Sequence, residues 1–443
     1  MTWRKKLFKD IVQFPPRVTL EKGKSYSFIP MEVLDGITKY VSPKAEKIWT
    51  GSGGAKFEDG DTLFARITPC LQNGKISQVK NLKGGKGFGS TEYFIFRGIP
   101  NVSDSDFLYY LSRTEEFRGY AIGSMVGASG RQRADATFVG QFEVNLPDLP
   151  TQTRIASVLS AYDDLIENNL KRIKLLEEFA QRTYEEWFVK FRVNGEGLAI
   201  NEDTGLPEDW ERKRLRDLVD YEIGGGWGEA EQTNDCSEPG YVIRGTDIDP
   251  LYIGSIKNVP FRFHKKSNMS SRKIQAGDIV FEVSGGSSFE GVAKSLLVTD
   301  ELLRQFDNDV MCASFCKLVR PSKTELSNIL YLTFRFFRKV KTTEIWEIRS
   351  ASNIVNYNWT AFLAFQKTIL PSGRILDAFN EVISPLYKQL FNVGNQNNLL
   401  KQSRDILLPR LMNGTISVEQ AEESFAMAAE PKVEYIKLKA DYE

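Results

Sequence analysis

A stretch near the middle of the chain, residues 146–191, limits the possible folds more than any other part of the sequence. Apolar residues recur in it with a spacing of seven in two interleaved series, and no glycine or proline interrupts residues 151–191. Such a repeat is typical of a coiled coil rather than of a helix that lies on a globular core. We therefore predict one long helix, capped at or beside Thr151, that packs against a partner helix. The two series are Ile155, Tyr162, Asn169, Leu176 and Thr183, and Leu159, Ile166, Ile173, Ala180 and Trp187.

The part of the chain before this helix is repeated after it. Four pairs of segments match in the same order, and the separation between matched segments grows along the chain, as expected if the second copy carries loop insertions. The pairs are WRKKLFKDIV (3–12) with WERKRLRDLV (210–219), GDTLFARI (60–67) with GDIVFEVS (277–284), FR (96–97) with VR (319–320), and NLP (145–147) with ILP (369–371). The sequence therefore predicts an internal duplication.

The duplication predicts a second long helix, and a second heptad pattern does follow Pro371. Pro385 lies inside this pattern and should kink the helix or split it in two. We expect the two long helices to pair with each other in antiparallel fashion, with Asn169 facing the region of Gln389 and Gln396 and fixing the register. Two alternatives are that each helix packs on its own domain, or that the helices drive homodimerisation. The second pattern consists of Ile375, Val382, Gln389, Gln396 and Ser403, and of Phe379, Leu386, Val393, Leu400 and Leu407.

The first copy, residues 1–145, alternates short β-like runs with turn clusters and adds a late helix at Ser105–Arg118, which indicates an α+β fold. The expected architecture is a pseudo-twofold chain of two repeated domains separated by two long helices that form an antiparallel coiled coil. The expected parts are a first domain (1–150), the first helix (151–192), a connector (193–209), a second domain (210–371), the second helix (372–415) and a tail (416–443) that is an accessory helix or frayed.

The sequence offers little support for catalysis. No Walker A motif, no glycine-rich cofactor loop and no Asn/Asp-Pro-Pro-aromatic signature of amino-methyltransferases occurs in it. Asp278 and Glu282 resemble a nuclease pair, but Ser284 stands where a lysine is needed, so we interpret the two acids as a turn residue and a strand-face residue. The single histidine, His264, falls in a segment that we interpret as a solvated basic loop. We therefore predict that the chain is not an enzyme.

Bulk composition excludes few classes of partner. Basic and acidic residues are equal in number, at 58 each, and binding to nucleic acid depends on local rather than total charge. The four cysteines show no CxxC pairing, so a structural zinc site is not expected. The first residues do not resemble a signal peptide, and no apolar run reaches the length of a membrane span. We expect a cytoplasmic protein without a membrane partner.

Polar, glycine-containing loops in both copies are candidates for DNA contacts. Arginine and lysine can pair with guanine, asparagine and glutamine can pair with adenine, and serine, threonine and backbone N–H groups suit phosphates. Taken one at a time, such loops are more often ordinary surface turns. The candidates in the first copy are Lys56, Arg66, Thr68, Gln72, Asn73, Lys75, Lys86, Ser90, Arg131, Gln132 and Arg133. Those in the second copy are Trp227, Arg244, Thr246, Ser284, Ser287, Lys294, Arg349, Ser352 and Asn353.

Four ordered motifs resemble the specificity (S) subunit of type I restriction–modification systems. They are LPDLPTQTRIASVLSAYDDLIENN (146–169), GDTLFARI with STEYFIFR (60–67 and 90–97), LPEDWERKRLRDLV (206–219) and RDILLPRLMNGTISV (404–418). The second copy departs from the first because it lacks an arginine at the place of Arg66.

The resemblance implies a division of labour among subunits. Each domain would read one half of a bipartite double-stranded DNA target, and the helices would hold the half-sites apart. Two methyltransferase (M) subunits would dock on the helices, on a charged face with Glu177, Glu178, Glu185 and Glu186, and restriction (R) subunits would join them. The chain itself would bind no cofactor, whereas S-adenosylmethionine, ATP and Mg²⁺ would sit on the partners. The alternative is a duplicated coiled-coil protein-interaction adaptor that does not read DNA.

Overall fold

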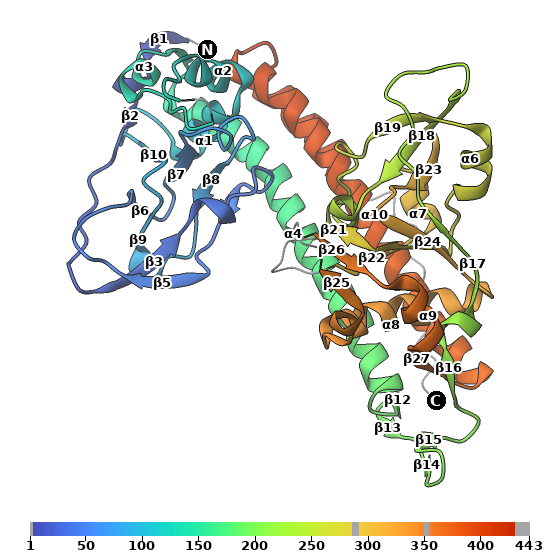
Figure 1. Ribbon diagram of the computed structural model, residues 1–443. Coiled ribbons are helices and arrows are strands. Elements are labelled where there is room, and N and C mark those ends of the chain that lie inside the picture. The colour runs from blue at the N-terminus through green and yellow to red at the C-terminus, as the bar shows by residue number, and fades with distance from the viewer. Residues whose placement is uncertain (1–2, 129, 286–291, 350–353, 430–443) are drawn as a thin grey trace. The chain divides into compact units, whose positions relative to one another are not determined.

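The computed structural model describes residues 3–128, 130–285, 292–349 and 354–429 (Figure 1). The chain divides into two compact units. Unit 1 joins residues 1–167 to residues 399–443, and unit 2 is the uninterrupted segment 168–398. Each unit contains one mixed domain of strands and helices together with part of both long helices. The finer domain boundaries expected from the sequence stay predictions.

The domain of unit 1 is built on two sheets and a short strand pair. The helix α1 (Ser105–Arg113) packs on the central strands of the first sheet and buries Phe107. The first sheet has the order β2 (Val12–Gln13), β10 (Tyr93–Gly98), β7 (Thr62–Ala65), β8 (Ile76–Val79), β4 (Tyr40–Val41), and the second has the order β5 (Ala45–Ile48), β3 (Ser25–Ile29), β9 (Lys86–Gly89), β6 (Lys56–Glu58). The strand pair is β1 (Arg4–Leu7) with β11 (Glu143–Leu146), and α2 (Glu115–Gly123) and α3 (Ala136–Gly140) complete the domain.

The domain of unit 2 repeats this plan. Its four-stranded sheet has the order β17 (Val219–Gly224), β24 (Cys316–Pro321), β20 (Ile279–Glu282), β22 (Ser295–Leu297). Its three-stranded sheets are β19 (Phe261–His264), β18 (Glu238–Ile243), β23 (Asp309–Cys312), and β21 (Ser284–Gly285), β26 (Val355–Tyr357), β25 (Glu347–Arg349). The strand pair β16 (Glu211–Arg214) with β27 (Lys367–Leu370) corresponds to β1 with β11. The helices are α5 (Ile248–Tyr252), α6 (Lys266–Arg272), α7 (Asp300–Leu303), α8 (Ser327–Lys339) and α9 (Trp359–Phe365).

One ion pair shows how closely the two domains correspond. In unit 1, Nε and Nη2 of Arg97 donate to the two carboxylate oxygens of Asp61 at 2.6 and 2.7 Å. In unit 2, the same two atoms of Arg320 donate to Asp278 at 2.7 Å each. Both aspartates follow the glycine of the matched GDTLF and GDIVF segments, and both are buried. The predicted duplication is therefore confirmed, and Asp278 is a buried structural partner as well as a turn residue.

The predicted first long helix is confirmed as α4, which runs without a break from Leu149 to Phe188. Its cap is Asp148, whose carboxylate accepts a hydrogen bond from the Thr151 amide at 3.0 Å. The predicted face is largely buried. Buried or half-buried positions of α4 are Ile155, Leu159, Tyr162, Ile166, Asn169, Ile173, Leu176, Ala180, Thr183 and Trp187.

The second long helix, α10 (Gly373–Met412), pairs with α4 within each unit. In unit 1, Arg404 forms a buried ion pair with Asp163. In unit 2, the Phe379 ring lies 4.7 Å from that of Phe188, and Gln389 faces a groove formed by residues 172–182. Higher residue numbers on one helix therefore meet lower numbers on the other, so the segments in unit 2 run antiparallel. The packing of two long helices was correctly predicted.

The register residues were wrongly predicted. Gln389 and Gln396 are exposed, and the buried polar side chain on this part of α10 is Asn397. The reason is that α10 also packs on its own domain, through contacts of Tyr387 with Tyr331 and of Phe391 with Tyr252, so its buried face is wider than a heptad seam. Of the expected seam, Phe379, Val393, Leu400 and Leu407 are buried, whereas Val382 and Leu386 are half-buried.

Two other expectations about the helices also need correction. Pro385 does not split α10, because its ring is exposed and the one hydrogen bond that it removes lies on the solvent side, where water can replace it. The face with four glutamates is not fully free either: Glu177 accepts from Arg335 at 2.7 Å and Glu185 from Lys339 at 2.6 Å, both on α8.

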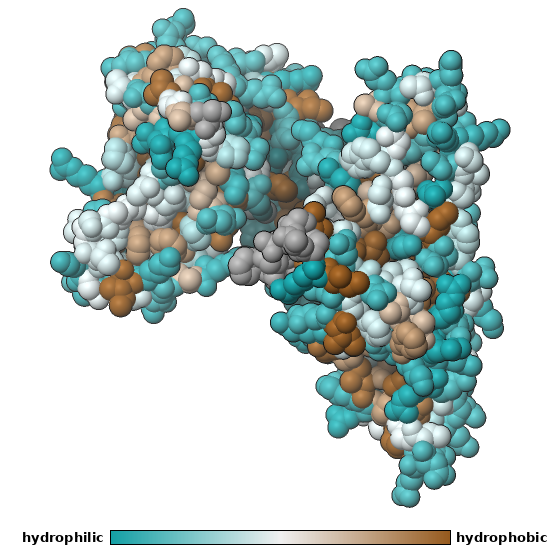
Figure 2. Space-filling view, in the orientation of Figure 1, coloured by the Kyte–Doolittle hydropathy of each residue, from teal (hydrophilic) through white to brown (hydrophobic). Residues whose placement is uncertain are grey.

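The described part of the tail forms the helix α11 (Val418–Ala429), which packs on α4 in unit 1. Arg154 forms ion pairs with Glu419 and Glu422, and the rings of Tyr162 and Phe425 lie 4.7 Å apart. The face of the molecule drawn in Figure 2 is mainly hydrophilic, with apolar groups in small separate clusters. Within the described part of the chain, no helix combines the length and the apolar composition that a membrane span requires.

Candidate nucleic-acid interface

Three chain segments meet beside the end of β7 in unit 1 and form a short cross-strand arrangement. Arg133 makes antiparallel bridges to Ile67 on one side and to Val126 on the other. Backbone hydrogen bonds between Val126 and Arg133, at 3.1 and 3.0 Å, close the second bridge. Directly opposed residues point to the same side of such a ladder, and Val126 is 72% exposed. We call Ile67, Arg133 and Val126 the first row.

Unit 2 has the same arrangement at the corresponding place. Asn356 on β26 is opposed by Ser284 on β21 and by Ile348 on β25. We call Ser284, Asn356 and Ile348 the second row. The two rows match because Ile67 and Ser284 occupy the same position in the matched strand segments.

Two further features place the rows at equivalent positions. The residues just before Ile67 and Ser284 donate their backbone amides to equivalent carbonyls: Arg66 to Glu92 at 3.0 Å and Val283 to Phe315 at 2.9 Å. Two residues after each central residue, Asp135 and Asn358 cap the short helices α3 and α9. The duplication therefore extends to the two rows.

In the first row a carboxylate orients the central side chain. Nε of Arg133 donates to Oε2 of Glu92 at 2.9 Å and Nη2 donates to Oε1 at 2.7 Å. These hydrogen bonds raise the pKa of Arg133. Nη1 also donates to the Arg131 carbonyl in a long hydrogen bond of 3.5 Å. The outer edge of the guanidinium, with a second hydrogen on each of Nη1 and Nη2, is not used by Glu92 and can bind an acceptor pair.

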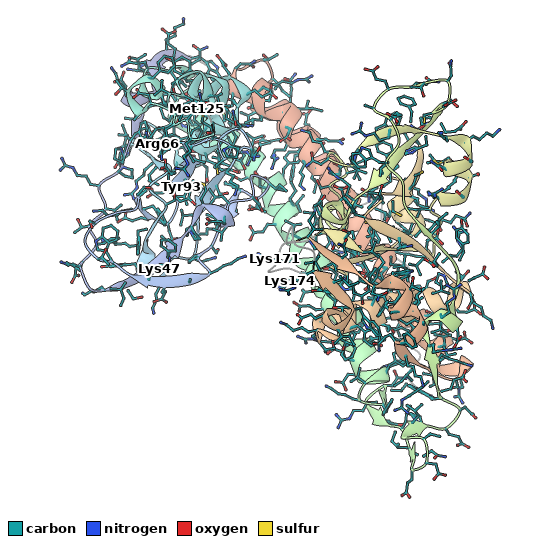
Figure 3. All side chains as sticks on the ribbon, viewed as in Figure 1. Lys47, Arg66, Tyr93, Met125, Lys171 and Lys174 are labelled. Atoms are coloured by element: carbon teal, nitrogen blue, oxygen red, sulfur yellow. The ribbon has the colours of Figure 1, made fainter. Side chains whose placement is uncertain are left out.

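Arg66 adds a second cation next to the first row. Its guanidinium lies 4.6 Å from the centre of the Phe94 ring, and its buried Nε has no hydrogen-bond partner among the described residues. An aromatic ring attracts a cation that lies over its face, and a guanidinium loses little hydration there, so the Phe94 ring stabilises Arg66 in this position. Figure 3 labels Arg66, Tyr93 and Met125 close together in the first domain, and Tyr93 and Met125 are the neighbours in sequence of Glu92 and Val126.

In the second row a hydroxyl orients the central side chain. Oγ of Ser284 donates to Oδ1 of Asn356 at 2.7 Å, which leaves the amide NH₂ without a partner among the described residues. Ile348 is 53% exposed and Phe315 is 62% exposed. The second row is therefore uncharged, and the exposed Phe315 lies beside it at the place that Glu92 has in unit 1.

The structure gathers part of the candidates of the first domain around the first row. Thr68 is joined to Gln132 by a backbone bond of 2.9 Å and a hydroxyl bond of 3.0 Å. Ser90 accepts from the Glu92 amide at 3.1 Å, and Arg131 is exposed. The other candidates lie further away in the loop 69–75 or on the second sheet: Gln72 and Asn73 are exposed, Lys75 donates to the Met31 carbonyl, and Lys56 and Lys86 lie on β6 and β9.

The candidates of the second domain are more scattered. Arg244 forms a fork with Asp247, Lys294 pairs with Asp249 at 2.8 Å, and Trp227 lies 4.8 Å from the Arg262 guanidinium. Thr246 and Arg349 are exposed. Ser287, Ser352 and Asn353 lie outside the described residues.

Sequence reasoning missed Val126, Glu92, Phe315, Ile348 and Asn356. Alignment of the two copies at Arg133 and Asn356 is the signal that could have found Asn356, because each of these residues precedes a helix cap by two residues. His264 was also wrongly interpreted, since it ends β19 and is 1% exposed rather than solvated.

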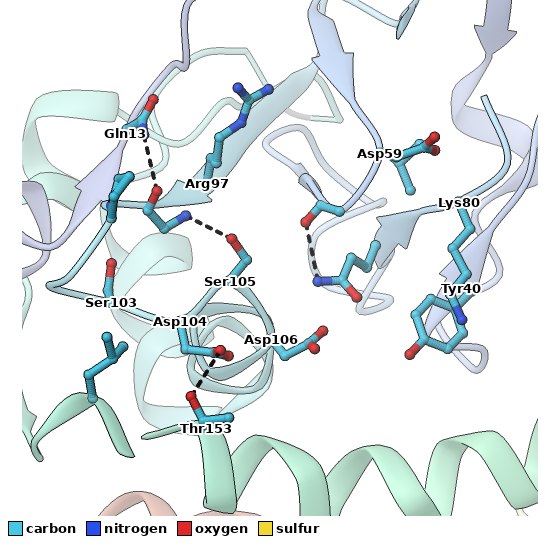
Figure 4. A pocket seen from close by; sticks show the side chains of 16 residues that line it. Gln13, Tyr40, Asp59, Lys80, Arg97, Ser103, Asp104, Ser105, Asp106 and Thr153 are labelled. Carbon is cyan, nitrogen blue, oxygen red and sulfur yellow. Dashed lines mark hydrogen bonds between the residues drawn. The ribbon is translucent and has the colours of Figure 1, made fainter. Parts of the chain in front are cut away.

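Two hollows of the described surface do not include residues of the rows and are lined by residues that hold the domains together. A pocket of about 930 Å³ in unit 1 lies between β10, α1 and the start of α4 (Figure 4). Its polar side chains are joined to one another, as in the bonds of Ser105 to the Gly98 amide and of Thr153 to Asp104. A cavity of about 560 Å³ in unit 2 is lined by Lys294, Arg335 and Arg349, among others. No cluster of three or more side chains suited to a metal ion occurs among the described residues.

Comparison with known proteins shows which proteins this chain is similar to. A family model described as "Type I restriction modification DNA specificity domain" matches residues 9–178. The type I restriction enzyme MjaIX specificity subunit of Methanocaldococcus jannaschii is 27% identical over 329 residues, which cover 71% of this chain and 70% of that protein. Over most of its length the chain is similar to type I specificity subunits.

Two further proteins are similar to this chain over most of its length. The HindI specificity subunit of Haemophilus influenzae is 22% identical over 430 residues and covers 83% of this chain and 88% of that subunit. The crystal structure of the S subunit from M. genitalium covers 93% of this chain and 96% of that chain with a TM-score of 0.50 at 12% identity, a likeness of fold. The resemblance to specificity subunits drawn from the sequence motifs is confirmed.

Proposed function

We propose that this chain is the DNA sequence-specificity subunit of a type I restriction–modification complex. The observation that carries the proposal is the exposed row that each domain presents at an equivalent place, with a side chain able to form paired hydrogen bonds at its centre. Two readers of the same fold but different surface chemistry suit a bipartite target whose halves differ in sequence. The domain description matched at residues 9–178 agrees with this role.

The long helices act as the spacer between half-sites. Each helix has 40 residues, about 60 Å at roughly 1.5 Å per residue. Two readers on one rigid spacer gain avidity for a target only when its half-sites have the matching separation. Inserting or deleting one heptad in both helices should therefore change the tolerated gap while each half-site sequence is kept, and an unchanged gap would contradict the spacer role.

Two methyltransferase subunits dock on the helices. Leu175 and Phe179 on α4 are 63% and 53% exposed, beside a groove of about 390 Å³ that includes Gln389. On α10, Leu399 is also 63% exposed, and it lies at the same distance from the matched NLP and ILP segments as Leu175. Because an exposed apolar residue lies at the equivalent place in both units, each unit can bind one copy of the same partner.

The chain supplies recognition and assembly in the cytoplasm, and its partners supply the chemistry. S-adenosylmethionine would bind on the methyltransferase subunits, and ATP and Mg²⁺ on the partner complex that includes the restriction subunits. The names of the relatives, which are specificity subunits, agree with a non-catalytic role.

Mapping of DNA methylation in the source organism tests the proposal. Deletion of the gene should abolish methylation at one bipartite sequence, and a plasmid copy should restore it. A coiled-coil adaptor that does not read DNA would leave the methylation pattern intact. Replacing residues 4–146 by the first domain of a relative should change one half of the methylated sequence and leave the other half unchanged.

A further inference from the structure

The two rows share a scaffold but differ in the chemistry of their central residues. Arginine stands at the centre of the first row and asparagine at the centre of the second. The third position is an exposed β-branched residue in both, Val126 and Ile348. A surface that reads DNA sequence needs a backbone arrangement that fixes how the protein lies against the DNA. It also needs a side chain that selects the base, and here that is the central residue of each row.

The second row has the chemistry of an adenine·thymine reader. An asparagine amide can donate to adenine N7 and accept from N6, a bidentate pair in the major groove. Ser284 donates to Oδ1 of Asn356 and so fixes which end of the amide is the acceptor. Oδ1 keeps a second lone pair for the adenine amino group.

The apolar end of the second row completes this match. Ile348 lies one strand away from Asn356, at the usual strand spacing of about 4.8 Å. The thymine of an adenine·thymine pair presents its methyl group in the same groove, and an apolar side chain is the usual contact for it. Small β-ribbons fit into the major groove of B-DNA.

The first row has different preferences. The guanidinium of Arg133 is oriented by Glu92, and its outer edge can bind O6 and N7 of guanine. At the place of Glu92, unit 2 has the exposed Phe315, which cannot orient a cation in this way. The orienting partner therefore changes together with the central residue.

We propose that Asn356 is a specificity-determining residue that reads an adenine in the half-site of the second domain, with Ser284 as its positioning residue and Ile348 against the thymine methyl group. This inference rests on the proposed function and adds the residues and the base pair. The other polar candidates Arg244 and Lys294 are bound to carboxylates of their own domain, which favours the second row over them.

Selection from a duplex pool with two randomised half-sites tests the assignment. The full chain in its complex with the methyltransferase subunits should select one bipartite sequence. Asn356→Ala should lose roughly tenfold of the preference at one adenine·thymine pair, in one half-site only. Asn356→Asp should shift the preference at this position toward cytosine, whose amino group a carboxylate accepts.

Modified bases separate contact from folding. Replacing the selected adenine by 7-deazaadenine removes N7, so it should weaken binding by the unchanged protein about tenfold but leave Asn356→Ala unaffected. Ser284→Ala should reduce the preference while keeping the sensitivity to 7-deazaadenine, as expected of a positioning residue. Ile348→Ala and replacement of the thymine by uracil, which lacks the methyl group, should each weaken binding, with no further loss when they are combined.

The outcomes distinguish this inference from the proposed function. If the unchanged complex selects no bipartite sequence, the proposed function fails and the inference fails with it. If it selects one, but Asn356→Ala and Ile348→Ala keep the same preference at every position, the proposed function stands and the second row is not the reader. A folded Ile348→Ala variant keeps the test decisive even where Asn356 variants do not fold.

Discussion

The two rows have the same backbone arrangement but different side chains. Unit 1 opposes Ile67, Arg133 and Val126, whereas unit 2 opposes Ser284, Asn356 and Ile348. The buried pairs Asp61–Arg97 and Asp278–Arg320, by contrast, keep the same residues and the same bonding atoms. After duplication, the interior kept its ion pair while the exposed row diverged, which is expected if the fold and the base preference are separate properties.

The helical pair differs between the units as well. In unit 2, Phe379 packs against Trp187 and Phe188 and is fully buried. We expect Phe379→Ala to cost about 3–5 kcal/mol, since it leaves a cavity between aromatic rings. Hydrogen exchange should show the loss of protection in unit 2. Phe365→Ala in the same unit is the control, because that ring is 72% exposed, and an equal effect of both substitutions would contradict the packing role.

In unit 1 the corresponding contact is ionic. Arg404 and Asp163 have side chains that are 4% and 2% exposed, and Tyr110 donates to the same carboxylate at 2.5 Å. We expect Arg404→Ala to cost about 3 kcal/mol, because it leaves a buried carboxylate without its cation. Denaturant unfolding measures this cost. Arg154→Ala, which removes exposed ion pairs with Glu419 and Glu422, should change the free energy of unfolding much less than Arg404→Ala does.

The first row should respond independently of the second. We expect Arg133→Ala to reduce the preference for a guanine by roughly tenfold in the half-site of the first domain and to leave the other half-site unchanged. Glu92→Gln should have a smaller effect on the same position, because it weakens the orientation of the guanidinium and keeps the arginine. Selection from randomised duplexes measures both effects, and equal losses in the two half-sites would indicate a general loss of charge or folding.

The smallest effect is a pH dependence confined to unit 2, which holds the single histidine. Burial lowers the pKa of His264, and a backbone interaction with Gly240 opposes this only in part. Between the lowered pKa and the ordinary value of 6.5, the unfolded state binds more protons than the folded state. The stability of unit 2 should therefore rise with pH through this window and fall on acidification below about 6.5.

Unfolding of unit 2 at pH 7.5 and pH 5.5, compared with a His264→Phe variant, measures this effect. The variant should lose the part of the pH dependence that the histidine causes. A pH dependence that is identical in the two proteins would show that His264 does not contribute.

Local and repeated features of the fold could be predicted from the sequence. The heptad pattern of α4 and the matched GDTLF and GDIVF segments are readable because their signals are regular or occur twice. The burial of Asn397 instead of Gln389 could not be read, since it depends on the contacts of α10 with its own domain. The rows were missed as groups because the pairing of separate chain segments brings their members together, which composition does not show. Arg133 and Ser284 were predicted one at a time, whereas Asn356 was not among the candidates.

The division of the chain also sets the order in which the units can be completed during synthesis. Unit 2 is continuous, so all of residues 168–398 are available before the last part of the chain is made. Unit 1 needs residues from both ends: Arg404 for the buried carboxylate of Asp163, and Gly414, where an added Cβ would lie 3.1 Å from the Trp3 ring. The first domain to leave the ribosome is therefore the last to be finished, and a chain that stops early leaves Asp163 without its partner.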